Sequence, residues 1–173
     1  MDSNNFESNC GVGEREGRIF SSLVSDKNYA LGHGIGRSGD VNALQPKAIG
    51  SSLIVKLTRA MTLNILKKVC GLSCINDVLV LPFATGMAIT LTLLTLKAQK
   101  PDAEYVVWPR IDQKTCLKAI TAANLKPLII EPLLQGDELT TNTAAITDAL
   151  KNNKVLCVIS TTSCFAPRAI DDV

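Results

Sequence analysis

The spacing of apolar and polar residues divides the chain into a polar first part and a more apolar remainder. The first fifty residues are rich in Gly, Ser, Asn and charge, so we expect loops around one short helix there. After Ser51, apolar residues recur at four-residue steps, which predicts an amphipathic helix. Ser51 and Ser52 are suitable N-caps for that helix, and Gly71 is a suitable stop.

Beyond Gly71, apolar runs of strand length alternate with segments of helix length. The runs predict strands at residues 78–81, 104–108, 128–130 and 155–159. The segments between them predict helices at residues 87–98, 113–123 and 143–150. Strands that are apolar on both faces and separated by helices indicate a mostly parallel sheet with flanking helices. The predicted fold class is therefore α/β, with residues 1–50 as a glycine-rich loop region and residues 51–173 as the main domain.

The uncharged stretch of residues 78–96 is nearly long enough to span a bilayer. Pro82 and Gly86 interrupt it, and four threonines punctuate it. We interpret it as a strand that leads into a helix, both packed in a protein core, and expect no membrane segment.

Composition and charge narrow the function classes. The 173 residues carry 18 Lys and Arg against 16 Asp and Glu, a net charge of +2, so no strong basic field indicates a nucleic-acid binder. The six cysteines include no C-x-x-C pair and there is one histidine, so we expect no metal site. The N-terminus does not resemble a signal peptide, and reduced thiols in the cytoplasm are the expectation.

The glycine-rich segment of residues 34–39 fits the pattern G-x-G-x-x-G. A dinucleotide site needs a strand before this pattern and a helix after it, whereas here the preceding residues are polar and Pro46 soon follows. Glycine-flanked backbone N–H groups beside Arg37 instead suit a phosphate or a carboxylate. From the spacing alone, a solvated surface loop is an equal alternative, and His33 is more often structural than a proton donor.

Three later segments follow predicted strands and are rich in hydrogen-bond donors. They are Ala84-Thr85-Gly86 at a strand-to-helix junction, the loop of residues 108–114, and the loop of residues 160–164. Ligands of parallel sheets bind beyond the carboxyl ends of the strands, so we expect these segments to meet at one site. A helix N-terminus with small residues attracts phosphate, although an ordinary helix cap explains the first segment equally well. We interpret Cys164 as a buried thiol rather than a nucleophile.

Six motifs, taken together and in order, resemble one family over essentially the whole chain. They are GVGEREGR, HGIGRSGD, QPKAIGSSL, ATGM, WPRIDQK and STTSCFAPR. The chain resembles the O-phosphoseryl-tRNA(Sec) selenium transferases, the last enzymes of selenocysteine synthesis in archaea and eukaryotes. The resemblance implies a pyridoxal 5'-phosphate enzyme of the aspartate-aminotransferase-like fold (fold type I). It further implies conversion of phosphoseryl-tRNA(Sec) to selenocysteinyl-tRNA(Sec), with selenophosphate as the selenium donor.

The resemblance also assigns roles to residues by their position in the motifs. The residues implied to bind the substrate phosphate are Arg37, Ser38, Gln45 and Lys47. The residues implied to bind the cofactor are Arg15, Ala84, Thr85, Gly86 and Gln113. Family members assemble as homotetramers with shared active sites, so these loops are expected to serve a neighbouring subunit's cofactor as well.

The sequence departs from the family pattern at both ends. Family members have an N-terminal helical segment before the position of Met1, and the family's Schiff-base lysine lies beyond the position of Val173. We therefore predict no catalytic residue in this chain and expect a truncated large domain that is inactive alone. Two alternatives stay open: a non-catalytic fragment that associates with full-length subunits, or another pyridoxal-phosphate-dependent lyase or desulfurase.

Overall fold

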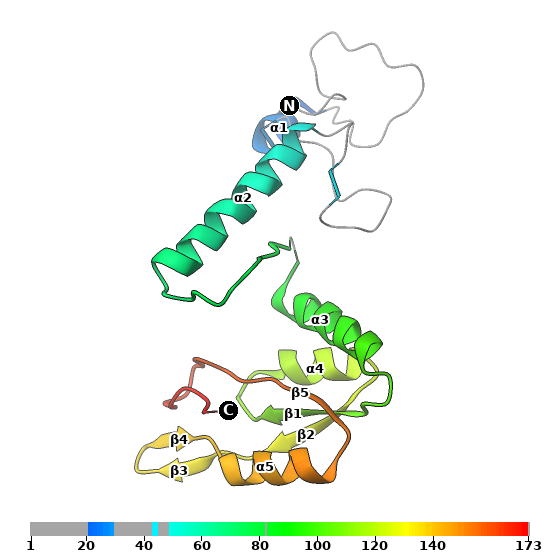
Figure 1. Cartoon of the computed structure of the whole chain (residues 1–173). Helices are drawn as coiled ribbons and strands as arrows, with labels where there is room; N and C mark the ends of the chain where they lie inside the picture. Colours follow the sequence, from blue (N-terminus) through cyan, green and yellow to red (C-terminus); the bar gives the residue numbers. More distant parts are fainter. Residues whose placement is uncertain (1–20, 30–42, 45–48, 82, 173) are drawn as a thin grey trace. The chain divides into compact units, whose positions relative to one another are not determined.

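A computed structural model describes residues 21–29, 43–44, 49–81 and 83–172 of the chain. The chain divides into two compact units, residues 1–82 and residues 83–173 (Figure 1). The predicted domain boundary after residue 50 stays a prediction.

The described residues of the first unit form two helices. Helix α1 (Ser22–Lys27) is the short helix expected in the first fifty residues, and the Ser21 hydroxyl caps it by accepting from the Val24 N–H at 3.4 Å. Helix α2 (Ile49–Lys68) begins before the predicted N-caps, so the prediction that Ser51 and Ser52 cap it is wrong. Gly71 adopts a φ of +71°, a left-handed conformation that glycine tolerates well, so its predicted place at the end of this helix is confirmed.

The prediction of a strand at residues 78–81 is wrong, because these residues form no strand. Side chains form hydrogen bonds with the Val78 backbone groups that a strand would use to pair with a neighbouring strand. The Val78 carbonyl accepts from Arg59 Nε at 2.9 Å, and the Val78 N–H donates to Asp77 Oδ1 at 2.8 Å. An apolar run is therefore not enough to define a strand when its backbone groups already have partners.

The second unit is built on a parallel three-stranded sheet in the order β2-β1-β5. Its strands are β1 (Tyr105–Pro109), β2 (Lys126–Ile130) and β5 (Val155–Val158). Its helices are α3 (Thr85–Gln99), α4 (Lys114–Ala122) and α5 (Thr143–Asn152). Helices α3 and α4 cover one face of the sheet and α5 covers the other (Figure 1). These elements confirm the predicted α/β class, the last three predicted strands and the three predicted helices.

A two-stranded antiparallel hairpin was not predicted. It consists of β3 (Leu133–Gln135) and β4 (Glu138–Thr140). Gly136 and Asp137 form its two-residue turn, and Gly136 has a φ of +62°. That Gly-Asp pair is a hairpin signal in the sequence, but each strand is too short for a clear apolar alternation.

The main core lies between the sheet and the pair α3 and α4. Central strand β1 contributes Val106 and Trp108, which pack with Leu93 of α3 and with Cys116 and Ile120 of α4. Successive strand residues point to opposite faces, so the fully buried Val107 lies on the face that α5 covers. Within the described part of the chain, none of the helices combines the length and the apolar character that crossing a bilayer requires.

Candidate functional site

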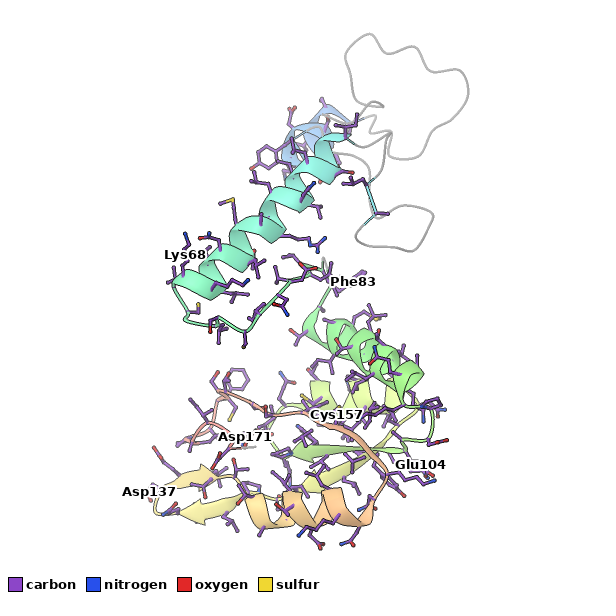
Figure 2. The ribbon with its side chains drawn as sticks, viewed as in Figure 1. Lys68, Phe83, Glu104, Asp137, Cys157 and Asp171 are labelled. Carbon is purple, nitrogen blue, oxygen red and sulfur yellow. The ribbon has the colours of Figure 1, made fainter. Side chains whose placement is uncertain are left out.

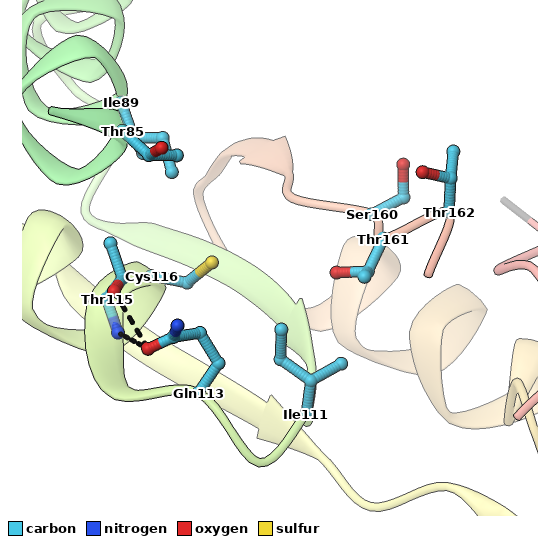
Figure 3. A pocket seen from close by; sticks show the side chains of 9 residues that line it. All are labelled: Thr85, Ile89, Ile111, Gln113, Thr115, Cys116, Ser160, Thr161 and Thr162. Atoms are coloured by element: carbon cyan, nitrogen blue, oxygen red, sulfur yellow. Dashed lines mark hydrogen bonds between the residues drawn. The ribbon is translucent and has the colours of Figure 1, made fainter. Parts of the chain in front are cut away.

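A cavity of about 330 Å³ opens in the second unit, beyond the carboxyl ends of β1 and β5 (Figure 3). Three separate segments line it: the start of α3, the connection from β1 into α4, and the residues after β5. The lining residues are Thr85, Ile89, Ile111, Gln113, Thr115, Cys116, Ser160, Thr161 and Thr162. The expectation that three donor-rich segments meet at one site is thus confirmed.

The lining combines polar and apolar side chains and carries no charge among the described residues. Five hydroxyl groups and one carboxamide face two isoleucines and a thiol, and no acidic or basic side chain is among the described residues that line the cavity. Hydroxyl and amide groups donate hydrogen bonds to anionic oxygens without the repulsion that a carboxylate would add. The cavity is therefore suited to a ligand with an anionic group and an apolar body.

The start of α3 supplies further donors. Its N-cap residue, Ala84, has no side-chain oxygen to accept from the first turn. The N–H groups of Met87 and Ala88 donate to the Ala84 carbonyl at 3.0 and 3.1 Å, whereas those of Thr85 and Gly86 have no acceptor among the described residues. Free N–H groups and the positive end of the helix dipole both favour an anion at this place.

Gln113 is fixed from the other side of the cavity. It is the N-cap of α4, and its Oε1 accepts from the Thr115 N–H at 3.3 Å and from the Thr115 hydroxyl at 2.9 Å (Figure 3). With Oε1 occupied, the amide nitrogen is the part of Gln113 that has no partner among the described residues. The structure thus brings Thr85 and Gln113 to the same cavity, while their role at a cofactor stays a prediction.

Ala84 and Gly86 flank Thr85 at the start of α3 without lining the cavity, and the remaining predicted site residues are not described by the structure. Those that lie outside the described residues are Arg15, Arg37, Ser38, Gln45 and Lys47. Their assignment to the substrate phosphate and to the cofactor stays a prediction. Among the described residues, no group of three or more His, Cys, Asp or Glu side chains is placed to hold a metal ion.

Two cysteines of the second unit are candidate reactive groups. Cys116 was not singled out from the sequence, yet it lines the cavity, and burial raises the pKa of its thiol. Cys164 was expected to be buried but is half-buried, and its thiol lies 3.6 Å from the Ala166 carbonyl oxygen as a donor. The raised pKa of Cys116 disfavours a thiolate nucleophile at that position.

The segment that follows the cavity-lining loop contains a buried ion pair, and the described residues after Pro167 form no helix. The Asp171 carboxylate pairs with the Arg168 guanidinium, and both side chains are almost fully buried. No spacing rule predicts this pair, because its other partners are distant in the sequence.

Comparison with known proteins identifies the family. The family model of O-phosphoseryl-tRNA(Sec) selenium transferase matches residues 1–173. The enzyme of that name from Dictyostelium discoideum is 54% identical over the whole chain, and those from Caenorhabditis elegans and Methanocaldococcus jannaschii are 42% and 33% identical. The chain spans 37%, 34% and 40% of the lengths of these relatives.

The fold comparison agrees. The crystal structure of an archaeal O-phosphoseryl-tRNA(Sec) selenium transferase superposes with a TM-score of 0.78 at 30% identity, covering 99% of this chain and 40% of that one. The predicted fold, a large domain of the aspartate-aminotransferase-like type, is thereby confirmed. Sequence and fold together place the chain in the O-phosphoseryl-tRNA(Sec) selenium transferase family.

Proposed function

We propose that the chain is part of an enzyme that converts O-phosphoseryl-tRNA(Sec) to selenocysteinyl-tRNA(Sec) with selenophosphate and pyridoxal 5'-phosphate. Family membership over all 173 residues supports the reaction. The observation that carries the proposal for this chain's own residues is the uncharged, donor-rich cavity at the start of α3.

The residues of the cavity fit the phosphate of the cofactor. The N–H groups of Thr85 and Gly86 and the Thr85 hydroxyl would hold its oxygens, with Ala84 at the N-cap. Gln113 would turn its amide nitrogen toward the ring. When bound, pyridoxal phosphate supplies an electron sink for bond cleavage next to the substrate's amino group.

The substrate side of the proposal rests on the sequence resemblance. Arg37, Ser38, Gln45 and Lys47 would bind the phosphate of the phosphoseryl group, and Arg15 would lie at the cofactor. Arginine forms paired hydrogen bonds with phosphate, and lysine adds a point charge. The proposal includes a cytoplasmic homotetramer that binds tRNA through residues outside this chain as well as within it.

The test uses the complete enzyme with phosphoseryl-tRNA(Sec), seryl-tRNA(Sec) and selenophosphate. We expect selenocysteinyl-tRNA only from the phosphorylated substrate, and a strong loss of that product in Arg37→Ala. Product from seryl-tRNA, or unchanged turnover in Arg37→Ala, would argue for a different lyase or desulfurase activity.

A second measurement concerns the 173-residue chain. After incubation with pyridoxal phosphate and dialysis, we expect no retained visible absorbance band, because none of the lysines in these 173 residues stands in the motif that the resemblance assigns to the Schiff base. Borohydride reduction followed by peptide mapping is the check. A band that is reduced onto one lysine would show that the chain forms its own Schiff base and would contradict the expected inactivity.

A further inference from the structure

Two buried charges lie in the segment that follows the cavity-lining loop. The side chains of Arg168 and Asp171 are 1% and 0% exposed, and Arg168 Nη2 forms an ion pair with Asp171 Oδ1 (Asp171 is labelled in Figure 2). Removing charges from water is costly unless further hydrogen bonds satisfy them. The remaining donors and acceptors of the pair show where those bonds go.

The pair contacts two of the segments that line the cavity, which we call its walls. The guanidinium group reaches the first wall, the connection from β1 into α4. Arg168 Nη1 donates to the Arg110 carbonyl at 3.0 Å. Arg110 is the residue after β1, and the chain continues from it to Ile111 and Gln113, which both line the cavity. Arg168 Nη2 is thus bound to Asp171, while Arg168 Nη1 holds the start of this wall.

The Asp171 carboxylate reaches the second wall, which is formed by residues 160–162 after β5. Asp171 Oδ2 accepts from the Thr161 N–H at 2.7 Å, and the Asp171 N–H donates to the Thr161 carbonyl at 3.1 Å. Thr161 is the middle residue of the three hydroxyl residues that line the cavity after β5. Both backbone groups of Thr161 are therefore fixed by Asp171.

The pair is itself anchored away from the cavity. The Thr141 hydroxyl donates to Asp171 Oδ1 at 2.8 Å and accepts from the Asp172 N–H at 3.2 Å. On strand β4, Leu139 accepts from the Ala169 N–H at 2.9 Å and donates to the Pro167 carbonyl at 3.2 Å. These contacts hold residues 167–172 in place without help from a ligand.

Stability alone is a poor explanation for such a pair. Buried ion pairs are often no more stabilising than apolar residues of similar volume. Arg168 Nε is also buried without a hydrogen-bond partner among the described residues, which adds to the cost. An apolar pair would lack the directional bonds to Arg110, Thr141 and Thr161.

We infer that Arg168 and Asp171 are positioning residues that set the two walls of the cavity relative to each other and thereby its affinity for a phosphorylated ligand. The inference rests on the proposed function for the identity of that ligand. It extends the candidate site to two residues that do not line the cavity.

The test is a titration of the 173-residue chain with pyridoxamine 5'-phosphate, whose amine cannot form Schiff bases with surface lysines. Quenching of Trp108, the one tryptophan of the chain, reports binding. In the double variant R168M/D171L we expect a melting temperature near that of the wild type and a Kd weakened by about tenfold, a size typical of losing residues that orient a binding group. A wild-type Kd in the folded double variant would overturn the inference.

The matched control is E104Q/K126M, which removes an exposed ion pair at the amino end of β1 in the same unit. It should leave the Kd unchanged. If R168M/D171L does not fold, Asp171→Asn takes its place, because it keeps the volume but loses one of the two acceptor oxygens. Weakened binding in folded Asp171→Asn supports the inference, and an unchanged Kd overturns it.

Hydrogen exchange separates this inference from the proposed function. If the wild type binds neither pyridoxamine phosphate nor pyridoxamine, the proposed cofactor role of the cavity fails. The positioning role then depends on the amides of Thr161 and residues 111–113, which should exchange faster in the variant while those of α5 keep their rates. Unchanged exchange at both walls would overturn the inference without reference to any ligand.

Discussion

Gly86 of α3 lies against Thr115 of α4 so closely that a Cβ at position 86 would sit 3.1 Å from Thr115 Cγ2. Few real side chains approach that closely, so an added Cβ at residue 86 would require Thr115 to shift by a few tenths of an ångström. The glycine therefore serves helix packing as well as the free N–H groups at the start of α3.

Gly86→Ala should lower the free energy of unfolding by about 1 kcal/mol, the lower end of overpacking costs, although alanine is the better helix former. Thr115 cannot easily move away, because its hydroxyl is bonded to Gln113 Oε1 at 2.9 Å. Urea unfolding measures the change.

The double variant G86A/T115S gives the control. Serine keeps the hydroxyl and removes the methyl group that the added Cβ would meet, so the double variant should recover the lost stability. If Thr115→Ser gave no rescue, the close contact would not be the cause.

Gln113→Ala and Gln113→Glu should separate capping from ligand binding. The alanine variant loses the N-cap acceptor of α4 and should be destabilised by about 1 kcal/mol. The glutamate variant keeps an acceptor and adds a favourable charge at the helix N-terminus, so its stability should be close to that of the wild type.

The same glutamate places a negative charge in the cavity. We therefore expect Gln113→Glu to weaken binding of pyridoxamine 5'-phosphate more than binding of unphosphorylated pyridoxamine, both measured by Trp108 quenching. Equal weakening of the two ligands would contradict a phosphate position near Gln113.

The sequence predicted those elements whose pattern is local and regular. Helix α3 and strand β1 come from long apolar runs, and the meeting of their ends follows from the rule for parallel sheets. The apolar run at residues 78–81 gave a wrong strand prediction, because the hydrogen-bond partners of the Val78 backbone are the side chains of Arg59 and Asp77 rather than a neighbouring strand.

The ion pair of Arg168 and Asp171 could not be predicted for a different reason. Arg168 bonds to Arg110, 58 residues earlier, and Asp171 bonds to Thr141, 30 residues earlier. Charged side chains are usually solvated, and only the folded topology reveals that these two are buried.

The buried thiol of Cys116 and the partly buried thiol of Cys157 should make stability fall in alkaline solution. Burial raises the pKa of Cys116 and Cys157 above the ordinary value of 9.0, so the folded state holds these protons more tightly than the unfolded state. Their contribution is complete below about pH 9 and is lost as the pH rises through the higher folded values. Urea midpoints between pH 7 and 11 would measure it.

The double variant C116A/C157A serves as the control for the thiols. Its free energy of unfolding should fall less than that of the wild type as the pH rises, because the two thiols are gone. Some loss should remain, because lysines and tyrosines titrate in both proteins. In the wild type at neutral pH, iodoacetamide should label the exposed Cys70 and Cys74 before Cys116. Equal labelling of Cys116 would show that the cavity opens readily.

The Arg59 guanidinium should control the titration of Asp77. It donates to both carboxylate oxygens, at 2.8 and 2.6 Å, and together with the Val78 N–H it holds the pKa of Asp77 below the ordinary value of 3.8. In Arg59→Met, carbon-13 NMR should find the Asp77 pKa raised toward that value. The stabilisation from this contact is present above pH 3.8 and lost as the pH falls through the folded value.

A second ion pair provides the cross-check. Lys126 lies 3.1 Å from Glu104 and lowers the pKa of that carboxyl group. Lys126→Met should therefore raise the pKa of Glu104 and leave that of Asp77 unchanged, whereas Arg59→Met should do the reverse. If each variant moved both carboxyl groups equally, general unfolding rather than the loss of a specific partner would account for the shifts. If Arg59→Met left the Asp77 pKa in place, the guanidinium contact that holds residues 77 and 78 against α2 would not persist in solution.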